Sequence, residues 1–236
     1  TDDAVQMISR VEERALAAIG RDLIYPPREK AGVIVVDSFP ALGTLAALRF
    51  IEWVQHHPEG VIALPTGKTP EYFIREVTRF LGGWKKKPVQ RELEERGVDP
   101  SLECDTTGLR FVQIDEFYPI DPRQENSFHH YVNRYYIAGL GLDRERALLI
   151  DGARIGIPPR ESLETVWPGG EVDLSLRYRM PASSREELQR DVLQQVDEWC
   201  TEYEQRVRAL GGIGFFLGGI GPDGHIGFNV RGSDLY

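Results

Sequence analysis

Apolar positions along this chain follow two periods, one typical of helices and one typical of buried strands. Helical spacing predicts helices over residues 3–20, 39–56, 127–137 and 185–210, with another starting at Pro70. Short apolar runs predict buried strands at Val33–Val36, Val61–Leu64, Leu109–Ile114, Leu148–Ile150 and Ile213–Leu217. Strands that alternate with helices indicate an α/β fold with a mainly parallel sheet and right-handed crossovers.

Capping residues support these helix bounds. Gly20 is suited to end the first helix, and Ser38 is suited to cap the second. Pro70 fits the first position of the third helix. Asn126 or Ser127 can cap the helix that follows.

Two stretches depart from the regular pattern. Residues 83–109 are strongly charged, which predicts a solvated helix in a surface excursion. Residues 153–184 are rich in proline and lack a clear period, which indicates an insertion or a lid. We therefore expect one domain over residues 1–236 with insertions at these two places.

Composition narrows the class of protein. A net charge of −9 and a pI near 5.2 argue against nucleic acid or an anionic membrane as the main partner. Cys104 and Cys200 stand in unrelated contexts, so we expect two free thiols in a reducing cytoplasm. No apolar run reaches the length of a membrane span. The chain lacks an initiator Met and ends at Tyr236, which suggests a processed or trimmed protein.

The richest motif follows the last predicted strand. Residues 218–229 contain four glycines, and Asp223 and His225 lie two positions apart among them. Glycine lets the backbone turn sharply and lets a ligand approach closely. An acid and an imidazole on such a turn indicate proton-transfer chemistry.

The motif has two other interpretations. The spacing Gly219-x-Gly221-x-x-Gly224 matches a dinucleotide fingerprint and follows a strand. Asp223 would then face the pyrophosphate, and Pro222 removes a backbone donor there, so this interpretation is disfavoured. A glycine-rich turn with a self-capping Asp would be favoured for an isolated Asp-Gly-His, but the whole string is too unusual for that.

A second motif, residues 65–70, joins a strand to a helix. The N-terminus of a helix suits an anion, Thr66 and Thr69 add hydroxyl donors, and Lys68 adds a charge. A nucleotide P-loop would need a glycine five residues before Gly67, where Ile62 stands. The loop therefore predicts a simple phosphate cradle.

The third motif is the acidic pair Asp115–Glu116. Asp115 ends an apolar strand, so we expect partial desolvation to raise its pKa; the alternative is an Asp that caps the next turn. Glu116 would point to the opposite face if the strand geometry continued through it. Because ligands of parallel sheets bind at the carboxyl ends of the strands, the three loops are expected to share one site.

Taken together, these blocks resemble the glucosamine-6-phosphate deaminase family, which is related to the 6-phosphogluconolactonases. The matching blocks occur in the family's order: Leu64-Pro-Thr-Gly-Lys-Thr-Pro70, with Lys68 where glycine is usual, Asp115-Glu116-Phe117, and Gly218 to Asn229. The run Ile226-Gly-Phe-Asn229 favours deaminases over lactonases. The C-terminal part of the family fold is expected to be missing after Tyr236.

The resemblance implies a Rossmann-like three-layer α/β sandwich and conversion of glucosamine 6-phosphate and water to fructose 6-phosphate and ammonia. It implies that Asp115 moves a proton between sugar carbons one and two, that His225 opens the pyranose ring, and that Asp223 orients His225. Neither step requires a metal or an organic cofactor. Substrate contacts are expected from Thr66, Gly67, Lys68, Thr69, Glu116, Gly219, Gly221 and Asn229. The expected partner is a small-molecule sugar phosphate, with no nucleic acid and no membrane; the subunit count stays open, a homo-oligomer included.

One position departs from the family pattern. Val230 stands where the family has a glutamate next to the Asn, and valine can neither accept a proton nor orient an imidazole. Another acid could substitute (candidates are Glu116, Asp121 and Asp234), the substrate could differ, or activity could be weak. The rival functions are a lactonase or isomerase acting on a sugar phosphate, and a non-catalytic sugar-phosphate sensor.

Overall fold

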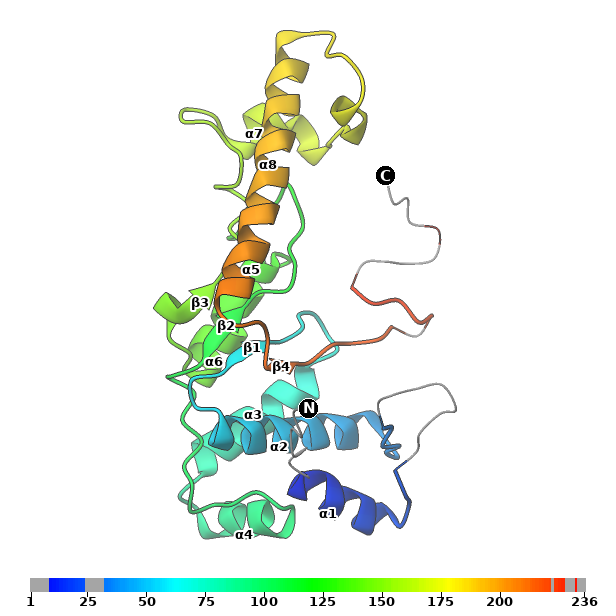
Figure 1. The fold of residues 1–236 in the computed structure, drawn as a ribbon, viewed down its shortest axis with the longest axis vertical. Coiled ribbons are helices and arrows are strands. Elements are labelled where there is room, and N and C mark those ends of the chain that lie inside the picture. Colours follow the sequence, from blue (N-terminus) through cyan, green and yellow to red (C-terminus); the bar gives the residue numbers. More distant parts are fainter. Residues whose placement is uncertain (1–8, 24–31, 222, 228–231, 233–236) are drawn as a thin grey trace, which may run out of the picture.

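A four-stranded parallel sheet lies at the centre of the molecule (Figure 1), in the order β3-β2-β1-β4. The computed structural model describes residues 9–23, 32–221, 223–227 and 232. Ile62 of β1 is in register with Phe111 of β2 on one side and with Phe215 of β4 on the other. The strands are β1 (Val61–Ala63), β2 (Arg110–Val112), β3 (Ala147–Leu148) and β4 (Phe215–Phe216). The prediction of a mainly parallel sheet is confirmed.

Helices connect and cover the strands. The α-helices are α1 (Arg10–Ile19), α2 (Phe39–His56), α3 (Glu71–Gly83), α4 (Lys87–Glu95), α5 (Phe128–Val132), α6 (Ala138–Leu140), α7 (Leu163–Val166) and α8 (Ser184–Ala209). A π-helix, η1 (Asn133–Ile137), joins α5 to α6 without a break. Short 3₁₀ turns form η2 (Arg144–Arg146), η3 (Pro168–Gly170) and η4 (Leu174–Arg177).

The two faces of the sheet are buried by different helices. Because successive side chains of a strand point to opposite faces, each strand contributes to both cores. On one face the strands pack against the C-terminal part of α8; the contributors are Val61, Ala63, Val112, Leu148, Tyr203, Val207 and Leu210. On the other face Ile62, Leu64 and Phe111 join the main core with α2, α3 and the α5–α6 segment. This is the three-layer α/β sandwich that was expected.

The predicted caps lie where the sequence placed them. Gly20 ends α1 with a left-handed φ of 67°, and the Ser38 hydroxyl accepts from the Ala41 N–H at 3.3 Å at the start of α2. Ser127 caps α5 in the same way. Pro70 was predicted to be the first residue of the third helix, but it is the N-cap residue, and α3 begins at Glu71.

The strand predicted at Val33–Val36 is wrong. Val33 forms only an isolated bridge, and the side chains of Val33 and Val35 are each 42% exposed. A four-residue apolar run carries no periodicity that separates a strand from an apolar connection, and here the run leads irregularly into α2.

The charged segment 83–109 contains the predicted helix, α4, but it also supplies part of the core. Leu93, Val98 and Leu109 are buried in the main apolar cluster, together with Trp84. The segment is therefore more than a solvated excursion. That it is an insertion relative to the family stays a prediction.

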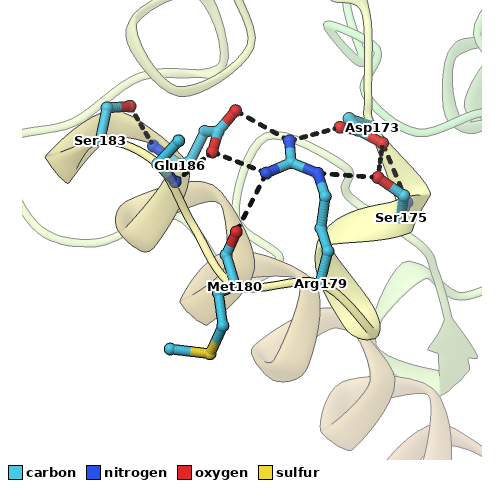
Figure 2. Close-up of polar contacts among 7 residues, drawn as sticks. Asp173, Ser175, Arg179, Met180, Ser183 and Glu186 are labelled. Carbon is cyan, nitrogen blue, oxygen red and sulfur yellow. Dashed lines mark hydrogen bonds and ion pairs between the residues drawn. The ribbon is translucent and has the colours of Figure 1, made fainter.

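The segment 153–184 packs against the N-terminal half of α8, which rises from the sheet in Figure 1. Its apolar centre is a second buried cluster made of Val166, Trp167, Leu176, Val192 and Leu193. At its end, the Arg179 guanidinium bridges the carboxylates of Asp173 and Glu186 at 2.7 Å each (Figure 2). Hydrogen bonds from Ser175 and Arg179 lower the pKa of Asp173 to about 2, and the Arg179 contact does the same for Glu186.

Over the described ranges, no helix combines the length and apolar character that a bilayer span needs.

The burial of Leu93 gives a test of how far the charged segment contributes to the core. We expect Leu93→Ala to lower the free energy of unfolding by about 2–5 kcal/mol, because it removes buried methyl groups and leaves a cavity. The matched control is Leu102→Ala, since Leu102 lies in the same segment and is 45% exposed; it should change stability by less than about 0.5 kcal/mol. Urea unfolding followed by circular dichroism measures both, and equal effects would contradict a core role for this segment.

Candidate active site

Three polar loops follow β1, β2 and β4, at the edge of the sheet where the carboxyl ends of the strands lie. The strands are parallel and adjacent in the order β2-β1-β4, so their carboxyl ends point the same way. Neighbouring strands lie about 4.8 Å apart, which puts the ends of β2 and β4 about 10 Å from each other. The loops are residues 64–70, 113–119 and 217–227.

The loop after β1 presents donors to solvent. Gly67 has φ +85°, a left-handed conformation that glycine adopts without strain. In the part of the chain that the structure describes, the backbone N–H groups of residues 66–69 have no hydrogen-bond acceptor. Lys68 is exposed and forms no ion pair with any described residue. Free N–H groups ahead of the 13-residue helix α3 are a favourable setting for an anion.

Two tyrosines hold this loop from behind. The Tyr131 hydroxyl donates to the Gly67 carbonyl at 2.9 Å, and the Tyr136 hydroxyl donates to the Pro65 carbonyl. Tyr136 is fully buried, and Tyr131 is half-buried. The helix predicted over residues 127–137 contains both tyrosines, but its sequence predicted this role for neither of them.

Asp115 lies in the loop after β2, half-buried. Its main-chain carbonyl accepts from the side-chain amide of Gln113 at 2.9 Å. The Gln113 side-chain oxygen accepts in turn from the Ile150 N–H at 2.9 Å, so the buried Gln113 fixes the end of β2 to the chain after β3. Burial raises the pKa of the Asp115 carboxyl, and the charge of Glu116 raises it further. The expected direction of the Asp115 pKa is confirmed.

Glu116 caps the start of α5. Its carboxylate accepts from the Ser127 hydroxyl at 2.8 Å and from the N–H groups of Phe128 and His129 at 3.0 and 2.7 Å. It also accepts from the N–H of Phe117 at 2.9 Å. With these four donors, Glu116 has a structural role as the cap of α5. Its contact with substrate stays a prediction.

The loop after β4 contains the Asp–His pair. The Asp223 carboxylate is hydrogen-bonded to Nδ1 of His225, so that contact orients the ring and lowers the pKa of Asp223. The turn closes through the Gly221 N–H, which donates to the His225 carbonyl at 2.8 Å. A Cβ on Gly221 would lie 2.0 Å from the His225 ring, so a side chain at this position would displace the imidazole from its present place.

The first and third loops approach each other closely. A Cβ on Gly219 would come within 3.0 Å of the Thr69 methyl group. Asn229, Val230 and Asp234 lie outside the described residues. Asp121, one of the acids considered as a substitute for the missing glutamate, pairs with Arg123, which lowers its pKa to about 2.

A cavity of about 870 Å³ adjoins the second loop. It lies between residues 117–126 and residues 151–170, and its lining includes Phe117, Arg123, Arg154, Glu161 and Trp167. Asp115 and the other two loops are not part of its lining. The idea that segment 153–184 closes over the sugar therefore stays a prediction. Among the described side chains, no group of three or more His, Cys, Asp or Glu is placed to share a metal ion.

On a Rossmann-like α/β sandwich the chain carries an exposed turn suited to an anion, the half-buried carboxyl of Asp115 and the Asp223–His225 pair, each in a loop that follows a strand. No protein-family model matches the sequence. The glucosamine-6-phosphate deaminase of Bacillus velezensis is 26% identical over 201 residues, which cover 85% of this chain and 60% of that protein. The enzyme of the same name from Halothermothrix orenii is 23% identical over 197 residues, covering 84% and 58%. These relatives support the resemblance to the glucosamine-6-phosphate deaminase family that the sequence motifs indicated.

Two further comparisons add a short, closely matching segment and a shared fold. The Borrelia hermsii glucosamine-6-phosphate deaminase is 64% identical over 36 residues, 15% of this chain and 14% of that protein. A solved monomeric glucosamine-6-phosphate deaminase of the NagB superfamily shares the fold with a TM-score of 0.53 at 21% identity, covering 84% of this chain and 59% of that one. The chain spans about 60% of the length of the curated relatives that it matches.

The capping role of Glu116 predicts a loss of stability on substitution. In Glu116→Gln the carboxylate that accepts four hydrogen bonds becomes an amide with one accepting oxygen, so we expect the free energy of unfolding to fall by about 1–3 kcal/mol. Glu125→Gln is the matched control, because Glu125 is exposed in the same connection. Chemical unfolding of both variants checks this, and an unchanged Glu116→Gln would refute the cap.

Proposed function

We propose that the chain binds a hexosamine 6-phosphate across the three strand-end loops and carries out the isomerising deamination of glucosamine 6-phosphate to fructose 6-phosphate and ammonia. The observation that carries the proposal is that the three loops follow the carboxyl ends of adjacent parallel strands. The names of the relatives support the same general activity.

In this proposal the phosphate sits on the loop after β1. The free N–H groups of residues 66–69 and the hydroxyls of Thr66 and Thr69 donate to its oxygens. Lys68, exposed at the same turn, adds a positive charge. The dipole of α3 favours the anion as well. Gly219 and Gly221 let the third loop come close to the bound sugar.

Asp115 is the proposed base for carbon-acid chemistry. A carboxylate in partly desolvated surroundings binds a proton more strongly than an ordinary aspartate, and this suits the removal of a proton from carbon two. The same group returns the proton to carbon one while a proton from the amine passes to the carbonyl oxygen. The open-chain 2-amino aldehyde thereby becomes a ketimine, which water hydrolyses to fructose 6-phosphate and ammonia. In this proposal Asp115, in the loop after β2, is the acid–base group of the isomerisation step.

His225 is the proposed ring-opening residue. Asp223 holds Nδ1, which leaves Nε2 to exchange a proton with the ring oxygen and the anomeric hydroxyl. The lowered pKa of Asp223 keeps it ionised at neutral pH, so it remains a hydrogen-bond acceptor for the imidazole. The predicted contact of Asn229 with substrate belongs to this same loop.

A second candidate function follows from one residue. Val230 in place of the family glutamate removes an acid from the ring-opening group. A protein that keeps the phosphate loop without that acid would serve as a non-catalytic sugar-phosphate sensor. Such a sensor would gain thermal stability with amino-sugar phosphates but release no ammonia.

The proposal is tested by ammonia release across a panel of hexosamine 6-phosphates, together with deuterium uptake from solvent at carbon two. Asp115→Asn is expected to lower kcat by about 10²–10⁴-fold and to abolish the exchange, because an amide cannot accept the proton. Asp99→Asn, an exposed position between α4 and β2, is the matched control and should leave both unchanged. Full exchange in Asp115→Asn would overturn the assignment of the base; binding without ammonia release in the unmodified protein would favour the sensor.

The raised pKa of Asp115 also predicts the pH dependence of the rate. The base acts only when ionised, so kcat should rise with pH, with a midpoint above the ordinary Asp value of about 3.9. Initial rates between pH 4 and 8 measure this limb, and a return of each sample to pH 7 controls for unfolding. A rate that stays level down to pH 4 would show that no carboxyl group with a raised pKa controls the reaction.

A further inference from the structure

One helical segment, residues 128–140, is joined to the phosphate loop by two tyrosine hydroxyls. Tyr131 in α5 donates to the Gly67 carbonyl at 2.9 Å, and Tyr136 in η1 donates to the Pro65 carbonyl. The two rings also contact each other edge to face, with centroids 6.0 Å apart. Both hydroxyls donate to main-chain carbonyls of the loop, so the two hydrogen bonds constrain the conformation of its backbone.

The π-helix explains how both tyrosines reach the same loop. In a regular α-helix, residues five apart are separated by about 140° around the axis and cannot point the same way. In η1 the Ala138 N–H donates to the Asn133 carbonyl, a spacing of five residues, which widens the turn. The wider turn brings Tyr136 back to the side of Tyr131. Such turns occur frequently at functional sites.

The anchored carbonyls determine where the neighbouring N–H groups point. A trans peptide unit is planar, and its C=O and N–H groups point in opposite directions. Because the carbonyls of Pro65 and Gly67 point at the tyrosines, the N–H groups of Thr66 and Lys68 point away from segment 128–140. These are two of the N–H groups that find no acceptor among the described residues.

We propose that Tyr131 and Tyr136 are positioning residues for an anion, holding the Thr66 and Lys68 N–H groups of the loop in the orientation that binds the phosphate of the substrate. The inference rests on the proposed sugar-phosphate site, but it concerns the phosphate-binding half alone. Without the hydroxyls the two peptide units can rotate, and the donors have to be ordered again on each binding event. Loss of the hydroxyls should therefore weaken the affinity for the phosphate and leave the chemical step unchanged, because Asp115 and His225 lie on other loops.

The test compares Tyr131→Phe and Tyr136→Phe with Tyr135→Phe in the full chain. Tyr135 lies between them in sequence, is 37% exposed and has no hydroxyl hydrogen bond to a described residue, so it is a matched control. Titration calorimetry with inorganic phosphate, and separately with glucose 6-phosphate, measures affinity, and thermal unfolding is recorded for each variant. We expect each of the first two substitutions to weaken binding about threefold to tenfold, which is the effect of one hydrogen bond, while Tyr135→Phe has no effect.

Several outcomes decide the proposal. Weaker anion binding in Tyr131→Phe with an unchanged melting temperature supports it, as does a raised KM at unchanged kcat if ammonia is released. Wild-type affinity in both Phe variants overturns it, even where the melting temperature falls, because the tyrosines would then only stabilise the fold. Failure of the unmodified protein to bind either anion also overturns it. Anion binding without any ammonia release would contradict the proposed reaction. The affinities of the two Phe variants would then still decide the positioning proposal.

Discussion

The candidate site depends on the anchoring of two strand-end loops to one helical segment. Residues 128–140 receive the Glu116 carboxylate at their start, and further along they donate two tyrosine hydroxyls to the loop at residues 65–67. The same segment is packed into the main core through Val132 and Leu140. The loops after β1 and β2 are thereby tied to a segment that is packed into the main core, and a preorganised site requires such support.

The roles proposed for the three loops agree with the exposure of each loop. The exposed loop after β1 offers N–H donors and a lysine, groups that attract an anion from solvent. Asp115 is half-buried, and burial raises its pKa, which makes its carboxylate a stronger base. The Asp223–His225 pair is more open, as expected for groups that exchange protons with a hydroxyl and water. Burial, with the nearby charge of Glu116, raises the pKa of Asp115, whereas the hydrogen bond to His225 lowers the pKa of Asp223.

Much of this arrangement could be predicted from the sequence, because caps, glycine turns and strand ends are local signals. The features that the sequence did not predict also have physical reasons. The run Val33–Val36 has the composition of a strand but forms no ladder, and the charges of segment 83–109 concealed the buried Leu93. Tyr136 was missed because an α-helical period was assumed where the chain forms a π-turn. Glu116 was placed by strand geometry, although the strand ends before it and the side chain turns to cap α5.

The central claim is that three loops distant in sequence bind one sugar phosphate. The most direct measurement is a titration of the isotope-labelled protein with glucose 6-phosphate, in which amide NMR signals of residues 66–69, 115–117 and 219–225 are followed together. The account predicts that signals from all three loops shift and share one half-saturation concentration. Shifts confined to a single loop, or half-saturation values that differ between the loops, would contradict it.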